Sequence, residues 1–199
     1  MSFRILQREF DEVIIIDLLP ANERRDWHLS EDLRDWLADQ GIEQFQLSCY
    51  SKKHVFEALE WSITRAASAS FVLHFTAHGN PSGIGLKATN ELITWEELRS
   101  PLQRLNSAFG GDLLVNMTAC QGFKATDIQK LEDPADPFYG LIGPTCSPSP
   151  ELARRMSQAF YQGLLDGVDI PQVIQQINTS ERGNVIWCRT HQHKRSLSL

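Results

Sequence analysis

Short apolar runs alternate with amphipathic segments along this chain of 199 residues. The apolar runs have the length of buried strands, and the segments between them repeat apolar residues at the spacing of a helix. One run, "VIIIDLL", is continuous enough to cross the middle of a sheet whose two faces are both covered. Strands that alternate with helices favour a mostly parallel sheet. The pattern therefore predicts an α/β fold with helices on both faces of that sheet.

Capping residues help to define the bounds of these expected elements. Ser30, Ser51 and Ser149 each stand where an N-cap is expected, and Thr94 with Glu97 forms a capping box. We expect strands at residues 12–19, 43–50, 71–78, 113–120, 138–145 and 184–190; helices at residues 29–41 (with Gly41 as its stop), 51–68, 147–167 and 169–178; a hairpin followed by a helix at residues 83–105; and a loop at residues 122–137.

Composition restricts the class of protein. The chain length suits one domain, which we assign to residues 1–199. A net charge of -6 argues against direct nucleic-acid binding, which needs clustered Lys and Arg. No apolar run reaches the roughly 20 residues of a membrane helix, and the N-terminus lacks an apolar signal-peptide core. We therefore expect a cytoplasmic protein that does not contact a membrane.

The four cysteines are scattered and show no C-x-x-C spacing. In a reducing compartment they are expected to be free thiols, and we expect no zinc site, other metal or cofactor. The terminal "HQH", with His191 and His193, is more typical of a solvated tail than of a metal site. Cys146 and Cys188 are expected to be core thiols, which leaves room for one chemically active cysteine among the four.

Two expected strands stop on chemically active residues. "FVLHFTAHGN" runs into His78 and Gly79, and "LLVNMTACQG" runs into Cys120 and Gly122. Ligands of parallel sheets bind outside the carboxyl ends of the strands. A right-handed crossover would make these two strands neighbours, about 4.8 Å apart. The two side chains are therefore expected to face one another across a cleft.

A thiol beside an imidazole is a plausible nucleophile and base. The thiolate is the reactive form, and an imidazole can accept the thiol proton. The backbone N–H groups of Gly79 and Cys120 are candidates for an oxyanion hole. The alternatives are ordinary: a cysteine at a strand end is often a small buried hydrophobe, and His-Gly is often a plain turn. His74, deeper in the same strand, is expected to be a hydrogen-bonded core residue.

"TAHGN" and "TACQG" together resemble the caspase-like cysteine peptidases of clan CD. Ala119, Cys120, Gln121 and Gly122 match the signature Q-A-C-[RQG]-G, with Thr118 in place of Gln. His78 lies slightly closer to the cysteine than the signature's histidine does. The resemblance is stronger to CHAT domains, the bacterial branch, and it covers about residues 70–177. It includes "ITWEEL", "GLIGPT" and an F-Y-x-x-L-x-x-G pattern at Phe160, Tyr161, Leu164 and Gly167.

The resemblance implies a caspase-like three-layer α/β/α sandwich and a cysteine endopeptidase. It implies that His78 is the catalytic base, that Cys120 is the nucleophile, and that Gly79 and Cys120 supply the oxyanion donors. The partner would be a protein or peptide substrate. A separate activating or sensor protein is also implied, as in bacterial antiviral defence or cell-death systems.

The substrate preference is predicted from Asp17, at the end of the first core strand. In relatives of this group the floor of the substrate pocket often lies there, and a carboxylate would select a substrate Arg or Lys. The alternative is that Asp17 caps a loop or binds an arginine of its own chain, since a buried carboxylate needs a partner. Three further acidic residues, Asp127, Asp133 and Asp136, either help to line the pocket or are solvated loop charges.

Two other classes of function compete with the peptidase. The first is a catalytically silent caspase-like module that binds a partner through the same cleft. The second is a small regulatory or nucleotide-binding domain, which the absence of G-x-G-x-x-G and P-loop motifs disfavours. Labelling of Cys120 by a thiol-reactive peptide, lost in His78→Ala, would separate the peptidase from the silent module.

Overall fold

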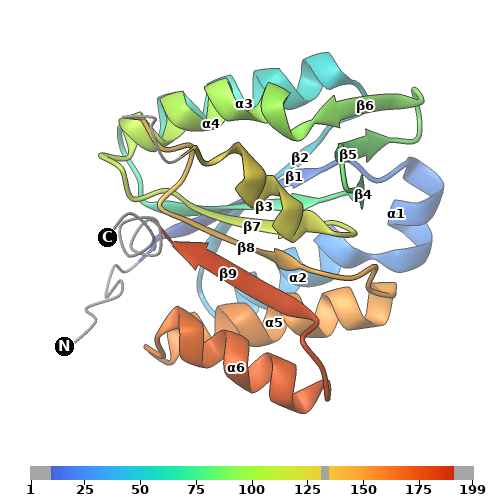
Figure 1. Cartoon of the computed structure of the whole chain (residues 1–199), viewed down its shortest axis with the longest axis vertical. Helices are drawn as coiled ribbons and strands as arrows, with labels where there is room; N and C mark the ends of the chain where they lie inside the picture. The colour runs from blue at the N-terminus through green and yellow to red at the C-terminus, as the bar shows by residue number, and fades with distance from the viewer. Residues whose placement is uncertain (1–9, 131–134, 191–199) are drawn as a thin grey trace.

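A computed structural model describes residues 10–130 and 135–190 of the chain. Within them, a six-stranded sheet in the order β2-β1-β3-β7-β8-β9 is covered by helices on both faces (Figure 1). This arrangement confirms the expected three-layer α/β/α fold. The strands of this sheet are β1 (Glu12–Asp17), β2 (Glu43–Ser48), β3 (Phe71–Thr76), β7 (Leu114–Thr118), β8 (Gly140–Pro144) and β9 (Ile186–Thr190).

The sheet is mostly parallel because helices carry the chain back between its first five strands. β1, β2, β3, β7 and β8 pair in parallel, and only β9 pairs antiparallel, against β8. All six residues of β1 are buried, as are all six of β3. β2 lies at the edge of the sheet and none of its residues is buried. The central position of β1 and the edge position of β2 agree with their sequence patterns.

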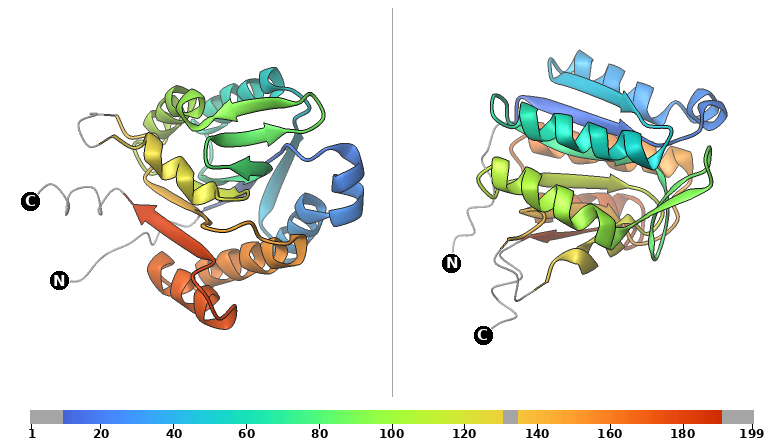
Figure 2. Two further views of the ribbon diagram at one scale, coloured as in Figure 1. Left: turned by 45° about the vertical axis from the view of Figure 1, so that its right-hand side comes forward. Right: turned by 90° about the horizontal axis from the view of Figure 1, so that it is seen from above.

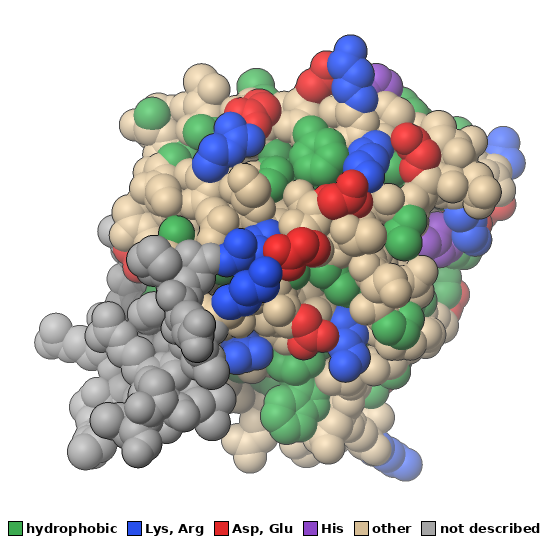
Figure 3. Space-filling model, turned by 45° about the horizontal axis from the view of Figure 1, so that its top comes forward, with side chains coloured by type: hydrophobic (Ala, Val, Ile, Leu, Met, Phe, Trp, Pro, Cys, Tyr) green, Lys and Arg blue, Asp and Glu red, His purple; other side chains and the backbone are tan. Residues whose placement is uncertain are grey.

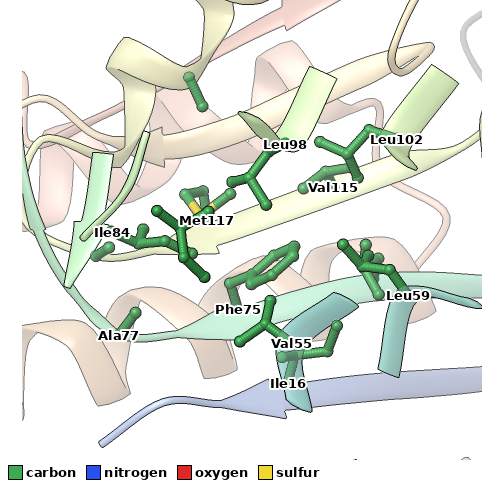
Figure 4. Packing of buried hydrophobic residues seen from close by; sticks show 14 of the residues in the cluster. Ile16, Val55, Leu59, Phe75, Ala77, Ile84, Leu98, Leu102, Val115 and Met117 are labelled. Carbon is green, nitrogen blue, oxygen red and sulfur yellow. The ribbon is translucent and has the colours of Figure 1, made fainter. Parts of the chain in front are cut away.

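The helices divide between the two faces of the sheet (Figures 1 and 2). Side chains alternate along each strand, so β1 contributes Ile14 and Ile16 to one core cluster and Val13 and Ile15 to the other. Figure 4 shows the first cluster, in which Phe75 of β3 packs among residues of the neighbouring strands and of the covering helices. One face carries α3 (Lys52–Arg65) and α4 (Trp95–Ala108), and the other carries α2 (Leu29–Asp39), α5 (Pro150–Leu165) and α6 (Ile170–Ser180).

The exposed surface over α3 and α4 mixes basic and acidic side chains (Figure 3). Arg104 pairs with Glu60 across the two helices, and Lys52 pairs with Glu97. Interspersed charges of both signs keep such a face solvated. Among the helices of the described residues, none is long and apolar enough to cross a membrane.

Most of the predicted caps are confirmed. The Ser51 hydroxyl accepts from the His54 amide, the Ser149 hydroxyl accepts from the Leu152 amide, and Thr94 with Glu97 forms the full capping box. The prediction that Ser30 caps the first helix is wrong. α2 begins at Leu29, after the N-cap His28, whose backbone is left-handed (φ 50°), and Ser30 is buried inside the helix.

His28 is left-handed because a further helix, α1 (Ala21–Trp27), ends there. The sequence pattern does not predict α1. None of its seven residues is buried, so it has no apolar face for a periodic pattern to reveal. Gly41 follows α2 with a φ of 76°, which confirms its predicted role at the helix end.

The predicted strand at residues 71–78 is too long. β3 ends at Thr76, and His78 begins a separate antiparallel sheet of three strands. In the same way, β7 ends at Thr118, two residues before Cys120. The predicted loop after Cys120 begins with a 3-10 helix, η1 (Gly122–Ile128). The small sheet contains β4 (His78–Asn80), β5 (Gly83–Leu86) and β6 (Glu91–Thr94).

Candidate active site

The two candidate residues follow the carboxyl ends of neighbouring strands. β3 and β7 pair in parallel, and Thr76 lies opposite Thr118 in the last pair of the register. The Ala77 amide then donates to the Thr118 carbonyl (3.2 Å), so the two chains stay together as they leave the sheet. The expectation that these strands are neighbours is confirmed. The register places His78 and Cys120 each two residues beyond it.

The backbone at Gly79 is in direct contact with the backbone at Cys120. A Cβ atom added to Gly79 would lie 2.3 Å from the Cys120 carbonyl oxygen and 3.2 Å from the Cys120 amide nitrogen. No side chain fits at that distance from a backbone atom, so only glycine permits this approach. Gly79 therefore brings the His78 segment against the Cys120 turn.

The turn that carries Cys120 is fixed by its own hydrogen bonds. The Gln121 amide donates to the Cys146 carbonyl (2.8 Å), and the Gly122 amide donates to the Ala119 carbonyl (2.8 Å). Gln121 adopts a left-handed backbone with a φ of 56°. Cys120 is partly exposed, and within the described residues its amide donates to no protein acceptor. That N–H group is therefore available to a ligand.

The imidazole of His78 contacts the helix α1. Its Nε2 atom hydrogen-bonds the Oε2 atom of Glu23. The other carboxylate oxygen of Glu23 accepts a hydrogen bond of 2.7 Å from Nζ of Lys87, the residue that follows β5. The ring of Trp27 meets the His78 ring edge-on, with centroids 5.6 Å apart. The side chains of His78 and Glu23 are 22% and 16% exposed, so their contact is largely shielded from water.

The charge of Glu23 depends on these neighbours. Burial alone would raise the pKa of the Glu23 carboxyl, but the hydrogen bonds from Lys87 and His78 outweigh it and hold that pKa below its usual value. The carboxylate is therefore ionised beside the imidazole at neutral pH. Glu23 is a site residue that the sequence pattern does not reveal, since it stands 55 residues before His78 on the unpredicted helix α1.

Asp17 has the internal partner that the sequence analysis named as the alternative to a substrate contact. Its Oδ2 accepts from Arg24 Nε at 2.7 Å, and its Oδ1 accepts from the Leu19 amide at 2.9 Å. The Asp17 side chain is fully buried and that of Arg24 is 11% exposed. Arg24 also donates to the Tyr50 hydroxyl (2.9 Å). The carboxylate is thus satisfied within the chain.

His74 is a hydrogen-bonded core residue, as expected. It is 1% exposed, and its Nδ1 atom lies 3.0 Å from the Tyr161 hydroxyl of α5. Burial lowers the pKa of His74 to about 3, so the imidazole is neutral at physiological pH. Thr118 and Ser157 continue the polar contacts between β7 and α5, with their hydroxyls 3.3 Å apart.

The other residues singled out in the sequence have mixed outcomes. Asp127 is exposed on η1 and Asp136 is partly buried, whereas Asp133, His191 and His193 lie outside the described residues. Cys49 is buried, but Cys146 and Cys188 are partly exposed. Burial raises the pKa of the Cys188 thiol to about 11 and also raises that of Cys146. Among the described residues, no group of three or more His, Cys, Asp or Glu side chains could hold a metal ion.

Comparison with known proteins identifies the fold. No protein-family model matches the chain, and no curated protein matches it in sequence. Solved structures do match, among them the crystal structure of drICE, a caspase. The two chains superpose with a TM-score of 0.58 at 14% sequence identity, over 94% of this chain and 90% of drICE. The chain therefore has a caspase-like fold.

Proposed function

We propose that the chain is a cysteine endopeptidase of the CHAT type in which Cys120 is the nucleophile and His78 is the base. One observation carries the proposal: the contact between Gly79 and the Cys120 backbone brings an imidazole and a partly exposed thiol to adjacent strand ends of a caspase-like fold. A thiol and an imidazole in this setting suit acyl transfer.

The proposed reaction passes through an acyl-enzyme. His78 takes the proton of the Cys120 thiol, and the sulfur attacks the carbonyl carbon of the scissile peptide. The C–N bond breaks as His78 returns the proton to the leaving amine. Water then attacks the carbonyl carbon of the thioester and gives a proton to His78. The C–S bond breaks, the carboxylic acid product leaves, and His78 returns the proton to the sulfur of Cys120.

The negative oxygen of the tetrahedral intermediate needs hydrogen-bond donors. The Cys120 amide has no protein acceptor in the described residues, which supports its proposed place in the oxyanion hole. The Gly79 amide is the second proposed donor. Its backbone lies against the Cys120 turn, where a donor of this kind is required.

Cleavage after Arg or Lys is part of the proposal. The ion pair between Asp17 and Arg24 limits how a substrate side chain could bind Asp17. A substrate cation would reach the Asp17 carboxylate only by replacing the guanidinium of Arg24. If Arg24 stays in place, the preference has to come from other acidic groups. Peptides that end in Arg, Lys, Asp or Leu before the reporter distinguish these cases.

The physiological setting is also proposed from the resemblance. An effector protease in bacterial antiviral defence would be controlled by a separate activating or sensor protein. The alternative is the silent partner-binding module. It is favoured by the described contacts of the His78 side chain, which go to Glu23 and Trp27 and not to Cys120.

The test uses purified full-length protein, a panel of fluorogenic peptides with the four end residues, and Cys120→Ala as control. Hydrolysis that disappears in Cys120→Ala supports the peptidase. A parallel reaction with a peptide that carries a thiol-reactive group tests directly whether the reactivity of Cys120 depends on His78. Labelling of wild type at Cys120 that is lost in His78→Ala supports the dyad, and equal labelling of both proteins supports the silent module.

A further inference from the structure

We propose that Glu23 is a positioning residue for His78: its carboxylate fixes the ring orientation of the imidazole and holds the proton on Nε2, which leaves Nδ1 to accept the thiol proton. This inference rests on the proposed peptidase function and deepens it from a Cys–His pair to a Cys–His–Glu arrangement. It assigns a role in that site to α1, a helix that the sequence pattern did not reveal.

The first support is that the two carboxylate oxygens of Glu23 bind different partners. Oε2 of Glu23 bonds His78 Nε2, and Oε1 accepts from Lys87 Nζ at 2.7 Å. A carboxylate held at one oxygen by an ammonium group cannot rotate freely. The remaining oxygen is therefore presented to the imidazole in a fixed direction, and an ionised oxygen can only accept a hydrogen bond.

The second support is the chemistry of imidazole. A neutral imidazole carries one proton, and the nitrogen that bears it is set by the hydrogen bond that it makes. Because Glu23 accepts at Nε2, that nitrogen is the donor and Nδ1 has the free lone pair. When Nδ1 takes a proton from a thiol, the resulting imidazolium faces a carboxylate, which stabilises the charge.

The third support is that α1 is tied to the body of the protein although none of its residues is buried. Arg24 binds Asp17 at the end of β1, and the carbonyl of Trp27 accepts from Arg154 of α5 at 2.6 Å. Beside these two anchors, Glu23 and Trp27 both reach the imidazole of His78, and Trp27 limits its rotation from the side. Figure 2 shows α1 in blue beside the small sheet in green.

A purely structural role is the alternative, in which Glu23 only joins α1 to the small sheet. The two roles differ in what they do to the imidazole. A tie between elements affects stability and leaves the tautomer of His78 unchanged. A positioning residue changes the tautomer and the reactivity of Cys120 while the protein remains folded.

The experiment compares full-length wild type with Glu23→Gln, Glu23→Ala and the control Asp26→Asn, which lies on the same short helix and pairs only with exposed Arg25 among the contacts described. Nitrogen-15 NMR at mildly alkaline pH measures which ring nitrogen of His78 is protonated, with its signals assigned by their loss in a His78 variant. Steady-state hydrolysis gives kcat and KM. The rate of Cys120 alkylation by iodoacetamide gives a readout that needs no substrate.

We expect the Nε2–H tautomer in wild type and in Asp26→Asn, and a mixture of tautomers in Glu23→Ala. In Glu23→Ala, kcat falls about 10- to 100-fold with little change in KM, a part of the 10²- to 10⁴-fold that a positioned base contributes. Glu23→Gln keeps an acceptor oxygen and is expected to lie between the two. An unchanged tautomer and an unchanged alkylation rate in Glu23→Ala would overturn the proposal.

Failure of the proposed function gives a different result. If wild type hydrolyses no peptide of the panel, the peptidase proposal loses its support, and the tautomer and alkylation measurements still decide the role of Glu23. A shifted tautomer with slower alkylation then supports Glu23 as the positioning residue of a reactive thiol. Normal values of both measurements overturn that role.

Discussion

The two histidines of the "HFTAH" segment lie four residues apart in surroundings that differ in every respect. His74 stands inside β3, is 1% exposed and meets only the neutral hydroxyl of Tyr161 among its described hydrogen bonds. His78 stands beyond the strand end, reaches solvent and bonds the ionised carboxylate of Glu23. The interior keeps an imidazole neutral, whereas the sheet end places it against an ionised carboxylate.

This difference separates structural from chemical use of the same side chain. Desolvation penalises a charge at His74, so that residue contributes to the core only as a neutral hydrogen-bonding group. In the proposed mechanism, a transient positive charge at His78 is compensated by Glu23.

The largest expected effect is on activity at the sheet end. His78→Ala is expected to lower kcat/KM for peptide hydrolysis by about 10³-fold or more, because the base is lost. Its free energy of unfolding should change by less than about 1 kcal/mol, since the side chain is partly exposed. Peptide hydrolysis and urea unfolding measure the two quantities. A variant that stays active would place both histidines in structural roles.

The second effect is a pH dependence of stability that belongs to His74. Its folded-state pKa of about 3 lies below the ordinary value of 6.5, so between these pH values the unfolded chain binds the extra proton. The stabilising contribution is complete above about pH 6.5 and is lost as the pH falls towards 3. In that window the free energy of unfolding falls by about 1.4 kcal/mol per pH unit from this residue alone.

Urea unfolding of wild type and His74→Leu across this pH window measures the contribution. The slope of wild type is expected to exceed that of the variant by about that amount. Equal slopes would show that His74 is not kept neutral by the fold.

A third, smaller effect concerns the partner of His74. His74→Leu at neutral pH is expected to cost about 1 kcal/mol of stability, because the buried Tyr161 hydroxyl loses its hydrogen bond to His74 and keeps only the one to Asn116. Adding Tyr161→Phe removes the hydroxyl that His74 no longer bonds, so the double variant should recover part of that loss. Thermal or urea unfolding of the four proteins completes the cycle. Strictly additive costs would contradict the hydrogen bond.

The smallest effect tests the approach of the two strand ends. Gly79→Ala places a Cβ atom 2.3 Å from the Cys120 carbonyl oxygen and forces the segments apart. We expect a loss of about 1–2 kcal/mol in stability and about 10-fold in hydrolysis. Gly85→Ala in the adjacent strand is the control, since its Cβ atom would lie 3.8 Å from His78 Cβ. Equal stability and equal hydrolysis in the two variants would contradict the close approach of Gly79 to the Cys120 backbone.

Strong local patterns made much of the fold predictable. The apolar runs of β1, β3 and β7 and the capping box before α4 are properties of short segments, and they identified these elements and the neighbouring strand ends. The ends of the strands were less well defined, because continuation of a strand depends on pairing. β3 stops at Thr76, after which the chain turns into a different sheet.

The partners of the site residues could not be predicted in the same way. α1 has no buried residue, and therefore no periodic apolar pattern marks it. Glu23 and Arg24 gain their roles through contacts with His78 and Asp17. Nothing in the local sequence distinguishes these two residues from other charged residues on a solvated surface.

The sequence by itself determined that this chain builds a parallel sheet with a histidine and a cysteine at neighbouring strand ends. Apolar periodicity and capping act over a few residues and are encoded where they act. Only the tertiary structure decided that Asp17 faces Arg24 and that His78 faces Glu23. Such pairings depend on the distance and burial of groups far apart in the chain, since electrostatic contacts arise only where the fold brings charges together.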